Sequence, residues 1–235
     1  MQKKRKRISP DPQMLHGHPI LLAGVTGFIS GMLLSIPVGP VNLTIINEGA
    51  RRGYRWALMI GLGATAMEVI YCSIAFTSLA SLFVGPVIQA VMELFSFAFM
   101  LYLGLKFLLA RSIPTVSRME ERLEGQLHPH SAFMTGFVRV MGNPGVLAFW
   151  IILALNFMTR GWVEPNHRGK LSCITGVALG TGLWFLGLSW AVSLGHRKFS
   201  ERTLLRMEHA SGIGLLILAL IHGLRLAWEM SEKHG

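Results

Sequence analysis

The sequence predicts an all-α integral membrane protein with about six transmembrane helices, arranged as two inverted three-helix repeats in which helices one and four are interrupted. Composition predicts the membrane class, because only 14% of the 235 residues are charged whereas soluble domains carry roughly 25%. The remaining charges are bunched and leave apolar stretches of the roughly 20 residues that a membrane-spanning helix needs. A matched pair of helix breaks predicts the repeats.

The apolar segments define the expected elements in order. A basic, flexible tail is expected over residues 1–19, followed by an apolar run that is longer than the roughly 7–15 residues of a signal-peptide core and is therefore read as a retained first helix. We expect the first repeat over 20–110, a polar connector over 111–131 and the second repeat over 132–235. The expected helices cover residues 20–46, 56–84, 87–110, 132–158, 171–195 and 207–228.

The basic residues predict orientation rather than nucleic-acid binding. The net charge of +10 comes mostly from Lys and Arg between the apolar segments, as membrane loops require. They are commoner after helices one, three and five than on the other side, which favours both termini outside. Counting the basic tail would cancel this difference. No nucleic-acid partner is expected.

Two expected helices contain prolines and glycines near their middle. Residues 37–42 read Pro-Val-Gly-Pro-Val-Asn, and residues 142–145 read Gly-Asn-Pro-Gly. Proline ends one helix and suits the first position of the next, with Asn as the preceding cap. Lipid does not satisfy the freed backbone groups, so the breaks must face the protein interior or a watery cavity. A helix that begins there is a site for an anion or a substrate carboxylate.

The two breaks occupy matching places. Gly27-Phe28 precedes the first and Gly136-Phe137 the second, and each broken helix opens a set of three. Repeats with an odd number of spans must be inverted, and interrupted helices at equivalent places in inverted halves mark the substrate site of secondary transporters. The simpler alternative is that the prolines merely kink two packed helices.

Two ionisable residues lie within the expected spans. Glu68 is deep in the second helix, where a charge is expensive and typically marks a transport pathway or a proton relay. Arg139 lies one helical turn before Asn143 on the same face, so it could pair with Glu68 or with a substrate carboxylate. The alternatives are a permanently protonated Glu68 in the core and an Arg139 that extends to the interface.

Several motifs resemble those of one transporter family. Ser-Ile-Pro-Val-Gly-Pro-Val-Asn at 35–42, Gly-Ala-Arg-Arg-Gly at 49–53, Gly-Leu-Gly at 61–63 and Glu68 resemble the opening signature of the lysine-exporter (LysE/RhtB) translocators. Phe-Met-Leu-Tyr-Leu-Gly at 99–104, Gly136-Phe137 before Asn143-Pro144, and Phe149-Trp150 resemble the rest, in the same order.

The resemblance implies a six-helix exporter of amino acids or related metabolites, driven by the proton gradient. It assigns proton coupling to Glu68, and together with the breaks it gives the substrate-binding candidates Pro37, Gly39, Pro40, Asn42, Arg139, Asn143 and Pro144. The sequence departs from the family pattern at Gly145, where lysine is frequent, at Val140, where asparagine is frequent, at Glu68, where aspartate is commoner, and at Arg139, which is unusual.

We therefore predict an inner-membrane, multi-pass exporter whose partners are a small-molecule substrate, protons and the lipid bilayer, with a homo-oligomeric state left open. One alternative is efflux of a divalent metal ion, which would want several carboxylates, thiols or imidazoles together; the chain shows few, and no metal or cofactor is expected. Another is a non-transporting membrane scaffold. No clustered nucleophile and base is found, so an enzyme is not expected.

Overall fold

The computed structural model describes residues 19–37, 39–78, 86–111, 131–194 and 201–232. The predicted tail and the connector over 111–131 lie outside these ranges, apart from their edge residues. Within the described ranges every regular element is a helix. They are α1 (Pro19–Ser35), α2 (Pro40–Arg52), α3 (Tyr54–Ser78), α4 (Pro86–Leu108), α6 (Ala132–Met141), α7 (Pro144–Thr159), α8 (His167–Leu194) and α9 (Glu201–Glu232).

The predicted spans are found as helices. α3, α8 and α9 are each long and apolar enough to cross a membrane, and the bent pairs α1–α2 and α6–α7 raise the number to five. α4, with its apolar part at Phe97–Leu108, corresponds to the remaining predicted span. The all-α membrane fold with about six spans is confirmed. α8 and α9 begin before the predicted apolar segments because their polar ends continue the helix.

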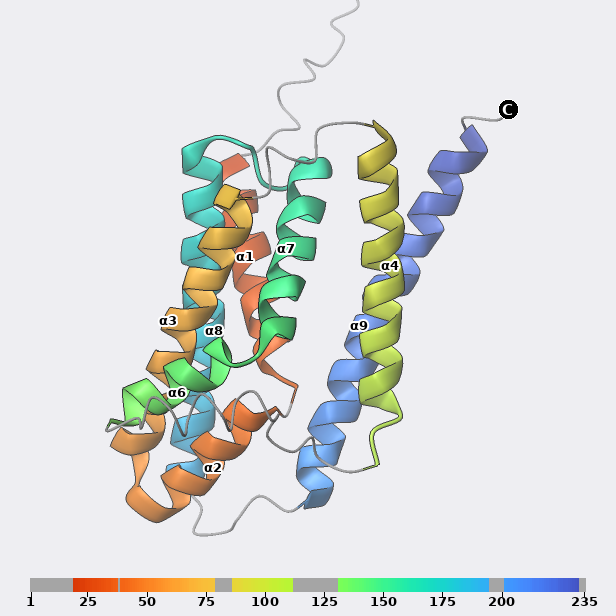
Figure 1. Cartoon of the computed structure of the whole chain (residues 1–235). Coiled ribbons are helices and arrows are strands. Elements are labelled where there is room, and N and C mark those ends of the chain that lie inside the picture. The colour runs from red at the N-terminus through yellow and green to blue at the C-terminus, as the bar shows by residue number, and fades with distance from the viewer. Residues whose placement is uncertain (1–18, 38, 79–85, 112–130, 195–200, 233–235) are drawn as a thin grey trace, which may run out of the picture.

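Both predicted interruptions are present at the predicted prolines. The chain bends by 69° between α1 and α2 and by 67° between α6 and α7. Pro40 and Pro144 take up the first turn of the restarted helices, after the cap residues Gly39 and Asn143, where a missing backbone donor does no harm. In Figure 1, α2 lies across the end of the molecule opposite to the start of α1. The start of α1 and the end of α9 lie at the same end, as an even number of crossings requires.

Glycines bring the first half of the chain into backbone contact with the second. A Cβ atom on Gly27 of α1 would lie 2.0 Å from the Cys173 carbonyl oxygen of α8. Correspondingly, a Cβ atom on Gly136 of α6 would lie 1.8 Å from the Ile60 carbonyl oxygen of α3. Side chains do not fit at such distances, so glycine is required for this close packing. The two Gly-Phe motifs thus contact the opposite half of the chain in the same way.

The helices α4 and α9 stand beside the other six helices of the described residues. They pack against each other and cross at an angle (Figure 1), and a Cβ atom on Gly212 of α9 would lie only 2.5 Å from the Leu108 amide nitrogen of α4. α4 also contacts α7, where the Phe99 and Phe149 rings lie 5.7 Å apart between centroids. The described residues therefore form a group of six helices and a neighbouring pair.

Candidate functional site

A cavity of about 410 Å³ lies where the two breaks, the helix pair α4–α9 and α3 meet. The predicted site residues that line it come from both halves of the chain: Pro37, Gly39, Pro40, Asn42, Glu68, Arg139 and Asn143. Pro144 is not among the lining residues, although its neighbours Gly145 and Val146 are. The fold thus brings together residues that are about a hundred positions apart in the sequence.

The first break is held by the side chain of Asn42. Asn42 is 2% exposed, and its Nδ2 donates hydrogen bonds to the carbonyl oxygens of Ser35 (2.8 Å) and Pro37 (2.7 Å). Its Oδ1 accepts a hydrogen bond from the Trp184 Nε1 of α8 at 3.3 Å. Both amide hydrogens are therefore used within the protein. Asn42 positions the break and has no further hydrogen to offer a substrate carboxylate.

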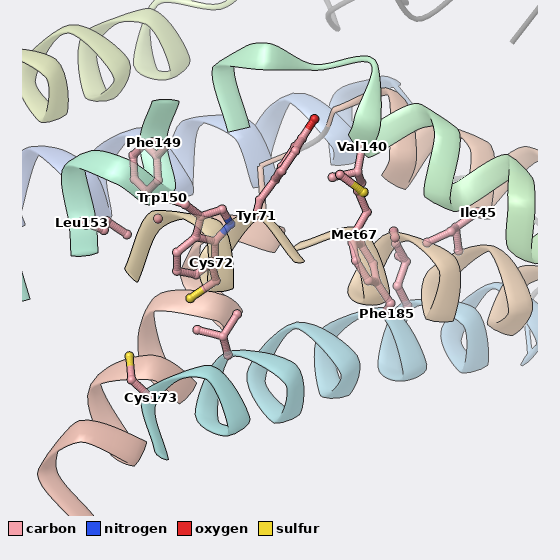
Figure 2. Close-up of a cluster of buried hydrophobic side chains, with 14 of the residues drawn as sticks. Ile45, Met67, Tyr71, Cys72, Val140, Phe149, Trp150, Leu153, Cys173 and Phe185 are labelled. Atoms are coloured by element: carbon pink, nitrogen blue, oxygen red, sulfur yellow. The ribbon is translucent and has the colours of Figure 1, made fainter. Parts of the chain in front are cut away.

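The second break is held by Tyr71 and Asn143. The Tyr71 hydroxyl of α3 donates a hydrogen bond to the Met141 carbonyl oxygen at 2.7 Å, and Figure 2 shows the Tyr71 ring directed toward this turn. Asn143 Oδ1 accepts from the Gly145 backbone N–H at 3.1 Å, so the predicted Asn-Pro cap is confirmed. Because the Gly145 N–H is bonded to Asn143, an anion at the start of α7 would meet the positive end of the helix dipole and not a free Gly145 N–H.

Glu68 is paired with a tryptophan rather than with an arginine. Glu68 is 9% exposed and lines the cavity, and its Oε2 accepts a hydrogen bond from Nε1 of Trp150 in α7. The Trp150 side chain is 1% exposed and lies in the buried cluster drawn in Figure 2. A buried carboxyl group needs such a donor. The sequence showed Trp150 only as part of a family motif, because the hydrogen bond joins residues that are 82 positions apart.

Two further charged residues line the cavity and were not predicted as site residues. Glu208 of α9 is 2% exposed, and Lys106 of α4 lies at a more exposed position. With Glu68 and Arg139 they place two acids and two bases around one cavity. Glu208 stands between Arg206 and His209 near the start of its expected helix, so the signal that marked Glu68, an acid deep within an apolar stretch, did not mark it.

The described part of the chain contains no group of three or more His, Cys, Asp or Glu side chains that could hold a metal ion. Cys72 and Cys173 are both fully buried, in α3 and α8 respectively. The cavity presents charged side chains, the amides of Asn42 and Asn143, and an apolar wall. Such a lining suits a small organic molecule with a few polar groups.

Comparison with known proteins gives a family and two relatives. The family described as LysE type translocator matches residues 32–227. A Bacillus subtilis protein named "Putative amino acid efflux protein YcgF" is 25% identical over 195 residues, which cover 83% of this chain and 92% of that protein. The Pseudomonas aeruginosa "Chemotactic transduction protein ChpE" is 24% identical over 162 residues, 68% of this chain and 77% of its own. No solved structure matches the chain.

Proposed function

The chain belongs to the LysE type translocator family of multi-pass membrane transporters, and on that premise we propose that it exports an amino acid or a related small polar metabolite through the cavity between its two helix breaks. The observation that carries the proposal is that both breaks and the buried Glu68 line one cavity. Interrupted helices that meet at a buried ionisable residue are typical of substrate sites in secondary transporters. The name of the Bacillus subtilis relative agrees with amino acid export.

In this proposal the substrate carboxylate binds on the side of the cavity formed by Arg139 and the starts of α2 and α7. Arg139 supplies a guanidinium group that matches a carboxylate, and the helix starts supply partial positive charge. Pro37, Gly39, Pro40 and Pro144 set the shape of the two helix starts. Asn42 and Asn143 keep these starts in position through the hydrogen bonds described above.

Glu68 is the proposed proton carrier. The Trp150 indole can only donate a hydrogen bond, and its bond to Glu68 is stronger when the carboxyl group is ionised. Uptake of a proton by Glu68 would therefore weaken the link between α3 and α7 as well as remove a charge from the cavity. This couples a proton to the arrangement of two helices that line the site.

The two halves, residues 20–110 and 132–235, are proposed to be inverted repeats in the inner membrane with both termini outside. Three features support the repeat. The bends of 69° and 67° match, Gly27 and Gly136 make equivalent backbone contacts with the opposite half, and α1 packs on α8 much as α6 packs on α3.

The proposal is tested by efflux of amino acids from cells that overexpress the protein and are loaded with a dipeptide mixture. We expect faster appearance of an amino acid outside, its loss on addition of a protonophore, and its loss in Glu68→Gln. The matched control is Glu48→Gln, which removes a carboxylate on α2 that pairs with Arg51 and Arg52 at the surface. Full efflux by Glu68→Gln would refute the role of Glu68, and no efflux by the unmodified protein would refute amino acid export.

A further inference from the structure

Resting on the proposed export function, we propose that the substrate is an electrically neutral amino acid with a large apolar side chain, of the kind of leucine, methionine or phenylalanine. The proposal stands on three properties of the cavity. They are the balance of its charged groups, the apolar character of its wall and the existing hydrogen bonds of its polar side chains.

The charged groups around the cavity balance. Glu68 and Glu208 face the same space as Lys106 and Arg139. With Glu68 ionised, a zwitterion adds one group of each sign and leaves the balance unchanged. A lysine-like or glutamate-like substrate would bring a net charge into a partly dry site, which is expensive without a matching counter-charge. The lining therefore favours a substrate with no net charge.

The wall of the cavity is mainly aliphatic and aromatic. It includes Leu34 of α1, Phe99 and Leu103 of α4, Val146 and Phe149 of α7, and Phe185 of α8. The Phe99 ring of α4 and the Phe149 ring of α7 are in contact. They form part of the cavity wall where the pair α4–α9 meets the other helices. Sites of this kind bind apolar groups, with a few polar groups that fix the orientation. The volume of about 410 Å³ lies within the range of roughly 300–1,000 Å³ of small-molecule sites and admits a large side chain.

Two uncharged polar side chains of the lining, Asn42 and Ser35, already use their hydrogens within the protein, and Asn143 uses its oxygen. Asn42 donates both amide hydrogens to Ser35 and Pro37, Asn143 Oδ1 accepts from Gly145, and the Ser35 hydroxyl donates to the Gly31 carbonyl oxygen at 2.8 Å. A hydroxyl or amide on the substrate side chain would lose water where it lies against the apolar wall, which disfavours threonine or glutamine.

The test uses the purified full-length protein reconstituted in liposomes. Exchange is measured for labelled leucine, methionine, phenylalanine, threonine, lysine and glutamate, each at the same concentration. We expect the three apolar amino acids to exchange about tenfold or more faster than the other three, because an apolar pocket discriminates against charged and hydroxyl-bearing side chains. Faster exchange of lysine, threonine or glutamate would overturn this inference and leave amino acid export intact. Exchange of none of the six, with intact protein, would overturn both.

A pair of variants tests the wall directly. Val146→Thr puts a hydroxyl on a lining position with little change of shape, and Val69→Thr makes the same replacement on α3 away from the lining. We expect Val146→Thr to lower the ratio of leucine to threonine exchange by about threefold or more and Val69→Thr to leave it unchanged. An unchanged ratio in an active Val146→Thr protein would contradict the inference. If that variant does not fold, the exchange assay with the six amino acids still tests the inference.

Discussion

The two helix breaks bend the chain by nearly the same angle but are held by different parts of the protein. At the α1–α2 break, the freed carbonyl groups of Ser35 and Pro37 accept hydrogen bonds from Asn42, only a few residues further along the chain. At the α6–α7 break, the Met141 carbonyl group accepts from Tyr71, which is 70 positions away on α3. The first break is therefore satisfied locally, and the second needs the tertiary fold.

The difference shows that a membrane protein can meet the same backbone requirement in two ways. Proline frees carbonyl groups wherever it interrupts a helix, and the membrane interior offers no water to bind them. A local side chain makes the first break a property of its own segment. A distant side chain makes the second break depend on the packing of α6 and α7 against α3. Substitutions at the hydrogen-bonding residues separate these two cases.

The largest effect is expected for Asn42→Ala. The change leaves the buried Ser35 carbonyl group and the Trp184 indole N–H without their partners, while the Pro37 carbonyl group keeps the Gly39 N–H. Because each of the two groups left without a partner costs about 1–3 kcal/mol, we expect the free energy of unfolding to fall by about 2–6 kcal/mol. The measurement is SDS-induced unfolding in mixed micelles, followed by circular dichroism. Asn47→Ala is the matched control, because Asn47 is exposed on the same helix. A loss no greater than that of Asn47→Ala would mean that Asn42 does not hold the break.

Tyr71→Phe is expected to have a smaller effect, because it leaves a single carbonyl group, that of Met141, without its donor. We expect a loss of about 1–3 kcal/mol in the same unfolding assay. Tyr54→Phe serves as the control, since the Tyr54 hydroxyl makes no hydrogen bond with the residues that the structure describes. If Tyr71→Phe destabilised the protein more than Asn42→Ala, the ranking of the two breaks by their number of freed groups would be wrong.

Asn143→Ala removes the cap of α7 and exposes the Gly145 N–H. Loss of an Asn cap typically lowers stability by about 1 kcal/mol, which a thermal unfolding measurement in detergent would detect. Asn143→Ser keeps an oxygen at the cap and should recover most of the loss. Equal melting temperatures for the two variants would show that the cap hydrogen bond contributes nothing measurable.

The smallest effect is expected for Gly39→Ser, which gives the first break the kind of cap that the second already has. Gly39 has an extended backbone with φ −94° and ψ −177°, and a Cβ atom there would meet no heavy atom within 4 Å. We expect a gain of a few tenths of a kcal/mol, because serine is a slightly better cap than glycine. Gly39→Ala adds the Cβ without the oxygen and should be mildly destabilising. A gain from Gly39→Ala would assign the effect to backbone rigidity instead.

The sequence predicted the features of the fold and of the site that depend on local chemistry. Proline and glycine within apolar segments located both breaks, and Asn143 before Pro144 predicted the cap. The partners of Glu68 and Met141 were not predictable, because Trp150 and Tyr71 come from helices that are apolar on nearly every side. In such helices the pattern of residues does not reveal which face is internal. For the same reason the place of Lys106 at the cavity could not be predicted.

The glycine contacts between helices limit how this protein can change shape. Shifting α1 along α8 by one residue, about 1.5 Å, would bring side chains against carbonyl groups that now face Gly27 and Gly176. The same holds for α6 on α3 at Gly136 and Gly63. These four helices are therefore expected to move as one rigid body. In the proposed export function, the cavity would then open by a tilt of α4 and α9, and α4 would separate from α7 at the Phe99–Phe149 contact.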